Sequence, residues 1–327
     1  MFESPAELWG TAIGFYLFLG GVSGGSFVTG AAADFLSVRS EKRKEMYQMT
    51  ARIGMAMSFI SIAIGGLILL THLGEPRNVF EIWLFQNWAS WMAIGVWVIV
   101  AMVIIAMLQL LWLGFGDWGG FDIKLRRIDW IADLTRPRQY ERLALSGVGA
   151  VLAVVLVIYT ALLLSAVNPV VPAWHPVLLP LLFLASGLSM GIAATVGITA
   201  LRAGVKDTGV HEFSLADDVI IIAEIVILAA FLMTLSGGGG AAAVTYERLT
   251  QTFALEFWGG VVLIGLVLPL VISAVLIAID KFSNISLSTR VEKTAYVTKF
   301  GFVLIGGWFL RMAVLFSAFN VPLIGLA

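Results

Sequence analysis

Residues 71–97 read THLGEPRNVFEIWLFQNWASWMAIGVW, and they connect the end of one long apolar run to the beginning of the next. This connection holds a histidine, glutamates, an arginine and amide side chains among tryptophans, whereas the apolar runs elsewhere are almost free of charge. An imidazole that titrates near neutrality, a fixed cation and aromatic walls suit a site that handles protons or a polar head group at a membrane edge. A plain hydrophilic loop with interfacial tryptophans has the same composition, so the stretch alone leaves both interpretations open.

The composition on either side of this connection is that of a membrane protein. Of 327 residues, 60% are hydrophobic and 13% are charged, whereas soluble domains carry roughly 25% charged residues. Several apolar runs reach the roughly 20 residues that an α-helix needs to cross the hydrocarbon core. Their approximate spans are 8–35, 50–72, 89–114, 141–166, 176–203, 215–235, 254–280 and 297–319. We therefore predict an all-α, polytopic integral membrane protein with eight transmembrane helices.

These helices are expected to form a single membrane domain over residues 1–327, arranged as two four-helix bundles. Residues 1–166 hold the first four helices and residues 167–327 the last four. The opening decapeptide MFESPAELWG lacks the basic residues that begin a cleavable signal peptide, so the first run is expected to remain as a transmembrane helix.

The basic residues predict the orientation. Apart from Arg77, Arg248 and Arg311, all of the 20 Lys and Arg residues fall in the odd-numbered connections or at the helix ends beside them. By the positive-inside rule these connections are cytoplasmic, so both termini are non-cytoplasmic. We predict a multi-pass protein of the inner (cytoplasmic) membrane whose 71–97 connection faces away from the cytoplasm.

The absence of cysteine restricts the redox chemistry. With no cysteine, the chain has no thiolate for an iron–sulfur cluster and no CxxCH haem attachment site. A bis-histidine haem is not expected either, because His175 and His211 lie at helix ends on opposite sides. No metal site is predicted. A redox role therefore requires a partner that carries the electrons.

Two features predict packing rather than chemistry. Small residues recur as Gly20, Gly21, Gly24 and Gly25 in the first helix and as Gly187 and Gly191 in the fifth, and such spacing lets helix backbones approach closely in lipid. Residues 118–134 alternate apolar and basic positions at helical spacing, which predicts a short helix on the cytoplasmic surface.

The outer ends of several helices carry residues that can bind a quinone. Tyr159 lies about two turns below the outer end of the fourth helix, and Tyr16 lies at similar depth in the first. Phenol and imidazole groups donate the hydrogen bonds that quinone carbonyls accept, while the isoprenoid tail lies in lipid. Taken singly, Tyr159 is also typical of an interfacial aromatic. The candidate set is Tyr16, His72, Glu75, Arg77, Asn87, Ser90 and Tyr159, with His175 at the start of the fifth helix.

Two charges lie within apolar runs, Glu224 in the sixth helix and Arg311 in the eighth. Intramembrane ionisable residues are costly and indicate function by default. Their depths differ by roughly 7 Å at about 1.5 Å per residue, within reach of an arginine side chain. A buried ion pair and a proton route both remain open for them.

Five stretches together resemble the NrfD / polysulfide reductase membrane-subunit (PsrC-like) family. They are YLFLGGVSGG (16–25), HLGEPR (72–77), NWASWMAIGVW (87–97), YTALLLSAVNP (159–169) and WHPVLLPLLFLASGLSMG (174–191). They cover most of the first five helices, and the last three match by count and length. The Asn-Pro that this family has before its SWM motif is here Asn87-Trp88, which departs from the pattern in the loop.

The resemblance implies a membrane subunit without a redox cofactor of its own. Such subunits bind menaquinone or ubiquinone near one face, where they dock an iron–sulfur (ferredoxin-like) subunit, often with a molybdopterin catalytic subunit beyond it. Carried over to this sequence, Tyr159 and the polar residues around His72 and Arg77 contact the quinone, with His72 and Tyr159 in catalytic roles.

We therefore predict a quinone-binding membrane subunit of a respiratory oxidoreductase. A secondary transporter remains an alternative, with Glu224 and Arg311 at a midplane site, although the two halves lack matched interrupted helices. A passive membrane anchor without a quinone site is the other alternative.

Overall fold

The computed structural model is built of helices throughout the part of the chain that it describes. That part comprises residues 5–72, 90–116, 119–121, 125–166, 168, 171, 173–205, 209–282 and 288–318, without the side chains of residues 5–9, 72, 92 and 282. Eight of its helices are long and apolar enough to cross a membrane. This confirms the predicted number of spans and the predicted fold class.

The spanning helices follow the predicted runs closely. Within the described residues they are α1 (Pro5–Arg39), α2 (Lys44–His72), α4 (Trp91–Gly114), α6 (Gln139–Ser165), α7 (Leu178–Ala203), α8 (Val210–Gly237), the continuous η2 and α10 (Leu255–Val267 and Leu268–Phe282) and α11 (Thr289–Ser317). The shorter helices within the same described residues are α5 (Arg126–Thr135), α9 (Gly240–Glu247) and η1 (Arg248–Thr252). Helices satisfy their backbone hydrogen bonds internally, as the hydrocarbon core requires.

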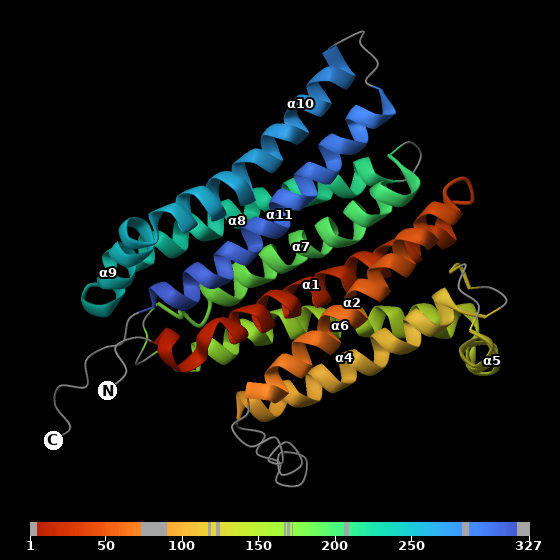
Figure 1. Ribbon diagram of the computed structural model, residues 1–327, viewed down its shortest axis with the longest axis horizontal. Helices are drawn as coiled ribbons and strands as arrows, with labels where there is room; N and C mark the ends of the chain where they lie inside the picture. Colours follow the sequence, from red (N-terminus) through yellow and green to blue (C-terminus); the bar gives the residue numbers. More distant parts are fainter. Residues whose placement is uncertain are drawn as a thin grey trace.

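Helices α1 and α7 form the centre of the molecule. Figure 1 shows them side by side, with α2, α4 and α6 on one side and α8, α10 and α11 on the other. In an apolar 18-residue stretch of each helix, 67% of the residues of α1 and 78% of those of α7 are buried. The corresponding shares are 28% for α8 and 22% for Leu255–Lys281. One buried cluster of apolar side chains runs through both halves. The separation into two four-helix bundles stays a prediction.

Glycine contacts hold α1 against α7, as the small-residue spacing predicts. A Cβ atom on Gly25 would overlap the carbonyl oxygen of Gly187, and one on Gly191 would overlap the backbone of Gly25. The same kind of contact joins Gly30 of α1 to Gly54 of α2. Because no side chain separates these backbones, polar groups on α7 and α11 come within reach of α1.

The surface helix is shorter than predicted. Helix α5 begins at Arg126, whereas residues 119–121 and 125, the other described residues of the predicted 118–134 segment, are not helical. Phe121 packs on Phe115 instead, with ring centroids 5.6 Å apart. The Gly116 amide donates a hydrogen bond to Asp129 of α5 over 3.0 Å. These contacts fold the start of the segment back against the end of α4.

The turn between α8 and α9 depends on glycine. Gly239 and Gly240 have φ angles of 63° and 49°, a left-handed conformation that other residues rarely adopt. The sequence SGGGG (236–240) therefore makes a tight reversal at the end of α8. This reversal leads into α9, η1 and η2. Further along the chain, Gly265 of η2 packs directly on Gly306 of α11.

Candidate functional site: a buried tyrosine pair and a line of intramembrane charges

The structure brings Tyr16 and Tyr159 together. Tyr16, in α1, is 0% exposed and Tyr159, in α6, is 3% exposed. Their phenol groups are close enough to interact electrostatically. Within the described part of the chain, Tyr16 Oη has no hydrogen-bond partner of good geometry. A buried hydroxyl normally has a partner, and the Tyr159 phenol is the group that interacts with this one.

Small residues make room for the pair. The Tyr159 ring lies directly against Gly95 at the start of α4, where a Cβ atom would overlap it. The Tyr16 ring faces Gly65 of α2, at 3.6 Å from the position of a Cβ atom. The two phenols therefore lie among α1, α2, α4 and α6, near the last turns of α2 and the first turns of α4.

Most of the polar connection between α2 and α4 lies outside the described residues. Glu75, Arg77 and Asn87 lie outside the described residues, as does the side chain of His72, whose backbone ends α2. Ser90 immediately precedes α4, and its side chain makes no capping hydrogen bond. The grouping of these residues with the tyrosines stays a prediction.

His175 has a local role. Its Nδ1 accepts hydrogen bonds from the backbone amides of Val177 and Leu178, over 3.2 and 3.3 Å. These amides lie at the N-terminus of α7, where helix N–H groups have no partner within the helix. His175 therefore caps α7, and these bonds explain its position without a ligand.

Arg311 is fully buried, at 0% exposure, and it ties three helices together. Its Nε donates to the Leu17 carbonyl of α1 over 3.2 Å, and its Nη1 donates to Ser186 Oγ of α7 and the Gly307 carbonyl of α11, over 3.0 and 2.9 Å. The guanidinium carbon lies 5.0 Å from the centre of the Phe183 ring. Hydrogen bonds and a cation–π contact thus replace water around this charge.

Glu224 is also buried, at 5% exposure, but it is not in direct contact with Arg311. No nitrogen–oxygen distance between these two described side chains falls within 4.0 Å. Ser186 stands between them, bound by Arg311 and also interacting with the Glu224 carboxyl group. Both charges are therefore buried, and they meet through a hydroxyl group rather than in direct contact.

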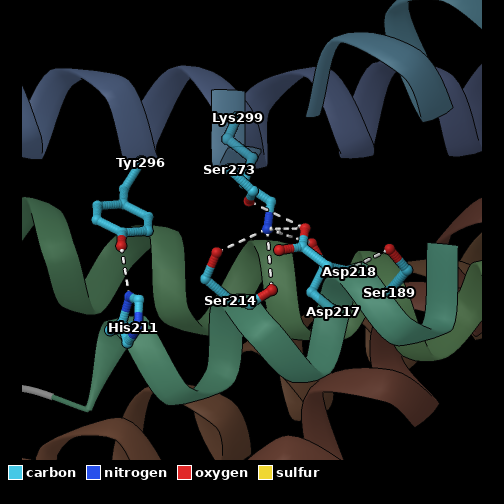
Figure 2. Close-up of polar contacts among 8 residues, drawn as sticks. All are labelled: Ser189, His211, Ser214, Asp217, Asp218, Ser273, Tyr296 and Lys299. Atoms are coloured by element: carbon cyan, nitrogen blue, oxygen red, sulfur yellow. Dashed lines mark hydrogen bonds and ion pairs between the residues drawn. The ribbon is translucent and has the colours of Figure 1, made fainter. Parts of the chain in front are cut away.

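A second charged cluster surrounds Lys299 (Figure 2). The ammonium group of Lys299, 0% exposed, lies 2.7 Å from Asp218 Oδ1 and 3.3 Å from Asp217 Oδ2. It also donates to the carbonyl and hydroxyl oxygens of Ser214, over 3.0 and 2.6 Å. Helices α8 and α11 are therefore joined by a buried ion-pair network.

Helices α7 and α10 contribute hydroxyl groups to this cluster. Ser189 of α7 donates to Asp217 Oδ1 over 2.6 Å, and Ser273 of α10 donates to Asp218 Oδ1 over 3.0 Å. The cluster thus draws polar atoms from four helices, and each carboxylate has a hydroxyl donor as well as the ammonium group.

Sequence reasoning missed this cluster. In the sequence, Lys299 is one more basic residue near the basic end of its apolar run, where lysine commonly extends toward water. The available signal was helical spacing: Ser214 and Asp218 lie on one face of α8, and Tyr296 and Lys299 lie on one face of α11. A second buried ion pair, Asp34 of α1 with Arg142 of α6, was missed for the same reason.

Comparison with known proteins agrees with this architecture. A family model described as polysulphide reductase, NrfD, matches residues 1–322. The chain is 27% identical over 287 residues to the protein NrfD homolog of Haemophilus influenzae, with 83% of this chain and 84% of that protein covered. It is 29% identical over 277 residues to the C subunit of the polysulfide reductase of Wolinella succinogenes, with 82% and 84% covered. It is also 30% identical over 209 residues to protein NrfD of Escherichia coli, with 62% of each covered.

The match therefore extends beyond the five motif-bearing stretches to the last three helices, which hold Lys299 and Arg311. The chain is a multi-pass membrane protein, and it belongs to the NrfD/polysulfide reductase membrane-subunit family.

Proposed function

We propose that this chain is the quinone- or quinol-binding membrane subunit of a respiratory oxidoreductase. The observation that carries the proposal is the buried pair of Tyr16 and Tyr159, whose phenol groups interact with each other within the helical core.

A menaquinone or ubiquinone head group fits these residues. A quinone presents two carbonyl oxygens, which accept hydrogen bonds, and Tyr16 and Tyr159 each offer an O–H donor. When bound, the quinone supplies the exchange of two electrons and two protons. Tyr159, held against Gly95, orients the head group, and Tyr16 donates to it from α1. His72, Glu75, Arg77, Asn87 and Ser90 complete the proposed site at its outer end.

The electrons must pass to another protein. The chain has no cysteine, so no iron–sulfur cluster is held by thiolates of this chain. The relative from Wolinella succinogenes is named as one lettered subunit of a polysulfide reductase, which supports a role for this chain within a complex. We propose an iron–sulfur subunit on the non-cytoplasmic face, with a molybdopterin or other catalytic subunit beyond it. The distribution of basic residues supports this orientation.

Two other roles are open to a test. A passive anchor would hold the same partner but need no buried phenols. A secondary transporter would use Glu224 and Arg311 for a solute, but Arg311 already makes three hydrogen bonds to protein groups. Solute uptake by the purified chain alone would favour the transporter.

The direct test removes the hydroxyl groups. In the assembled complex, Tyr159→Phe and Tyr16→Phe should each lower quinone-linked turnover at least tenfold, because each deletes one hydrogen-bond donor and little volume. Tyr140→Phe is the matched control, since Tyr140 begins the same helix as Tyr159 and is 83% exposed.

Electron transfer between the partner subunits and a soluble dye reports whether each variant complex is intact. If both buried-tyrosine variants keep full quinone-linked turnover, the quinone site is elsewhere or absent, and the passive anchor becomes the better description.

A further inference from the structure

A groove lies between the end of α7 and the start of α11, two neighbouring helices, at the basic end of the molecule (Figure 1). Its volume is about 410 Å³. Arg290 and Lys293 line it, together with threonine hydroxyl groups and the apolar side chains of Leu201 and Val297. None of these residues belongs to the tyrosine pair or to the Lys299 cluster, so the groove is a separate feature of the surface.

The charge of the groove is positive. None of the residues that line it is acidic. Arg290, Lys293 and Val297 follow one another at spacings of three and four, which places them on one face of α11. Glu292 lies on another face, where it interacts with Tyr296 beside α8. Within the described part of the chain, neither Arg290 nor Lys293 forms an ion pair with a carboxylate.

Lys293 is held in place by α7. Its ammonium group donates a hydrogen bond over 2.5 Å to the carbonyl oxygen of Leu201, in the last turn of α7. An ammonium group has three N–H donors, so this bond leaves two for another acceptor. Arg290 is exposed, and its guanidinium group adds five further donors. The groove therefore offers a fixed set of charged donors to an anion.

The start of α11 adds to the positive potential. The helix dipole favours negative charge near a helix N-terminus, where the first backbone N–H groups have no partner within the helix. Arg290 and Lys293, among the first five residues of α11, place positive charge there instead. A phosphate group in the groove would compensate both side chains and the dipole.

The groove also crosses from polar to apolar sequence. The apolar run of the last helix begins at about residue 297, so Arg290 and Lys293 lie roughly 6–10 Å before it at about 1.5 Å per residue. Val297 and Leu201, which is 51% exposed, supply apolar surface at this membrane edge. A free phosphate ion would leave that apolar surface uncovered. A phospholipid, in contrast, presents a phosphate group and an acyl chain side by side.

We propose that this groove binds one acidic phospholipid from the leaflet at the basic end of the molecule. Its phosphate oxygens accept hydrogen bonds from Arg290 and Lys293, and Thr294 donates to a head-group or ester oxygen. One acyl chain lies along Val297 and Leu201. Basic pockets between transmembrane helices bind acidic head groups in this way. The bound lipid joins α7 to α11, and its binding does not depend on the proposed quinone site.

The test measures lipid binding to the whole chain in mild detergent by native mass spectrometry. Phosphatidylglycerol and phosphatidylcholine with the same acyl chains are titrated separately. The wild type should retain one phosphatidylglycerol at concentrations at which phosphatidylcholine is not retained. Arg290→Gln combined with Lys293→Gln should weaken phosphatidylglycerol binding about tenfold or more, because the phosphate group loses both cations. Arg290→Gln alone keeps the bond from Lys293 to Leu201, should weaken binding severalfold, and decides the case if the double variant does not fold.

Lys42→Gln combined with Lys44→Gln is the matched control. It removes two exposed positive charges at the same end of the molecule, outside the groove, and should leave phosphatidylglycerol binding unchanged. Thr294→Trp is the complementary variant, because it keeps both cations and fills the groove with an indole ring. It should also expel the lipid.

Equal weakening in the two double variants would overturn the proposal, because the lipid would then respond only to the overall charge of this end. Unchanged phosphatidylglycerol binding in Thr294→Trp would overturn it as well. Inorganic phosphate that binds the wild type as tightly as phosphatidylglycerol would assign the groove to a free anion instead of a lipid.

Discussion

Arg311 brings a guanidinium group with five N–H donors into the core of the molecule, and neighbouring backbone and hydroxyl oxygens accept three hydrogen bonds from it. Glu224 lies nearby, separated from it by Ser186. The two charges compensate each other through this hydroxyl group rather than in direct contact. Removing one of them leaves the other buried without its counter-charge.

We therefore expect the effects of the two substitutions to be non-additive. Arg311→Met should lower the free energy of unfolding by about 3–5 kcal/mol, the range for breaking a buried pair, and Glu224→Gln should cost less because it keeps a polar side chain. The double variant should be less destabilised than the sum of the single variants, as judged by denaturant unfolding in mild detergent. Simple additivity would show that the two side chains act independently.

Single residues show where sequence reasoning succeeds and where it fails. Depth along an apolar run was enough to pair Tyr16 with Tyr159, because both lie at similar distances from the same membrane face. Depth was not enough for Lys299, since a lysine about three turns into its helix can extend to water or turn inward. Only the position of Asp217 and Asp218 on the neighbouring helix decides which occurs, and that position requires the tertiary structure.

At the scale of helices, close packing of α1 on α7 governs how the two halves of the chain meet. The sequence predicted which glycines make close contacts, because small residues at spacings of three or four are typical of helix interfaces in lipid. It did not predict that α1 meets α7 rather than another helix. All the spanning helices are strongly apolar, and lipid provides little hydrophobic drive to choose among partners.

The α1–α7 contact gives a prediction about stability. Gly191→Ala places a Cβ atom into the backbone of Gly25, so we expect the free energy of unfolding to fall by about 1–3 kcal/mol. Gly301→Ala is the control within α11, because a Cβ atom there meets nothing within 4 Å. It should leave stability unchanged or raise it by up to about 1 kcal/mol. Equal thermal midpoints for the two variants in detergent would contradict the packing account.

At the scale of the whole molecule, charge asymmetry predicts the topology. Apart from three arginines, every Lys and Arg falls near one set of connections. Reporter fusions at the C-terminus should therefore report a non-cytoplasmic location, and fusions in residues 115–140 a cytoplasmic one. A cytoplasmic C-terminal reporter would invert the molecule and place the proposed electron-transfer partner on the wrong face.

The fold as a whole was largely predictable, and the site only in part. Eight apolar runs and their connections determine the number and order of spans, because each run must cross the hydrocarbon core as a helix. The charged cluster of Lys299, Asp217 and Asp218 was not predictable, because it depends on which helix faces touch. Hydropathy gives the length of a span but not the direction in which its polar side chains point.

The most direct test of the central claim is to locate a photoreactive quinone analogue on the assembled complex. After illumination, mass spectrometry should find the label on α1 and α6 near Tyr16 and Tyr159, and an excess of unmodified quinone should suppress it. Lipid-facing positions of α6 such as Val151, which is 67% exposed, should carry at most label that quinone does not suppress. Quinone-suppressible label confined to α8, α10 and α11, or absent altogether, would contradict the account.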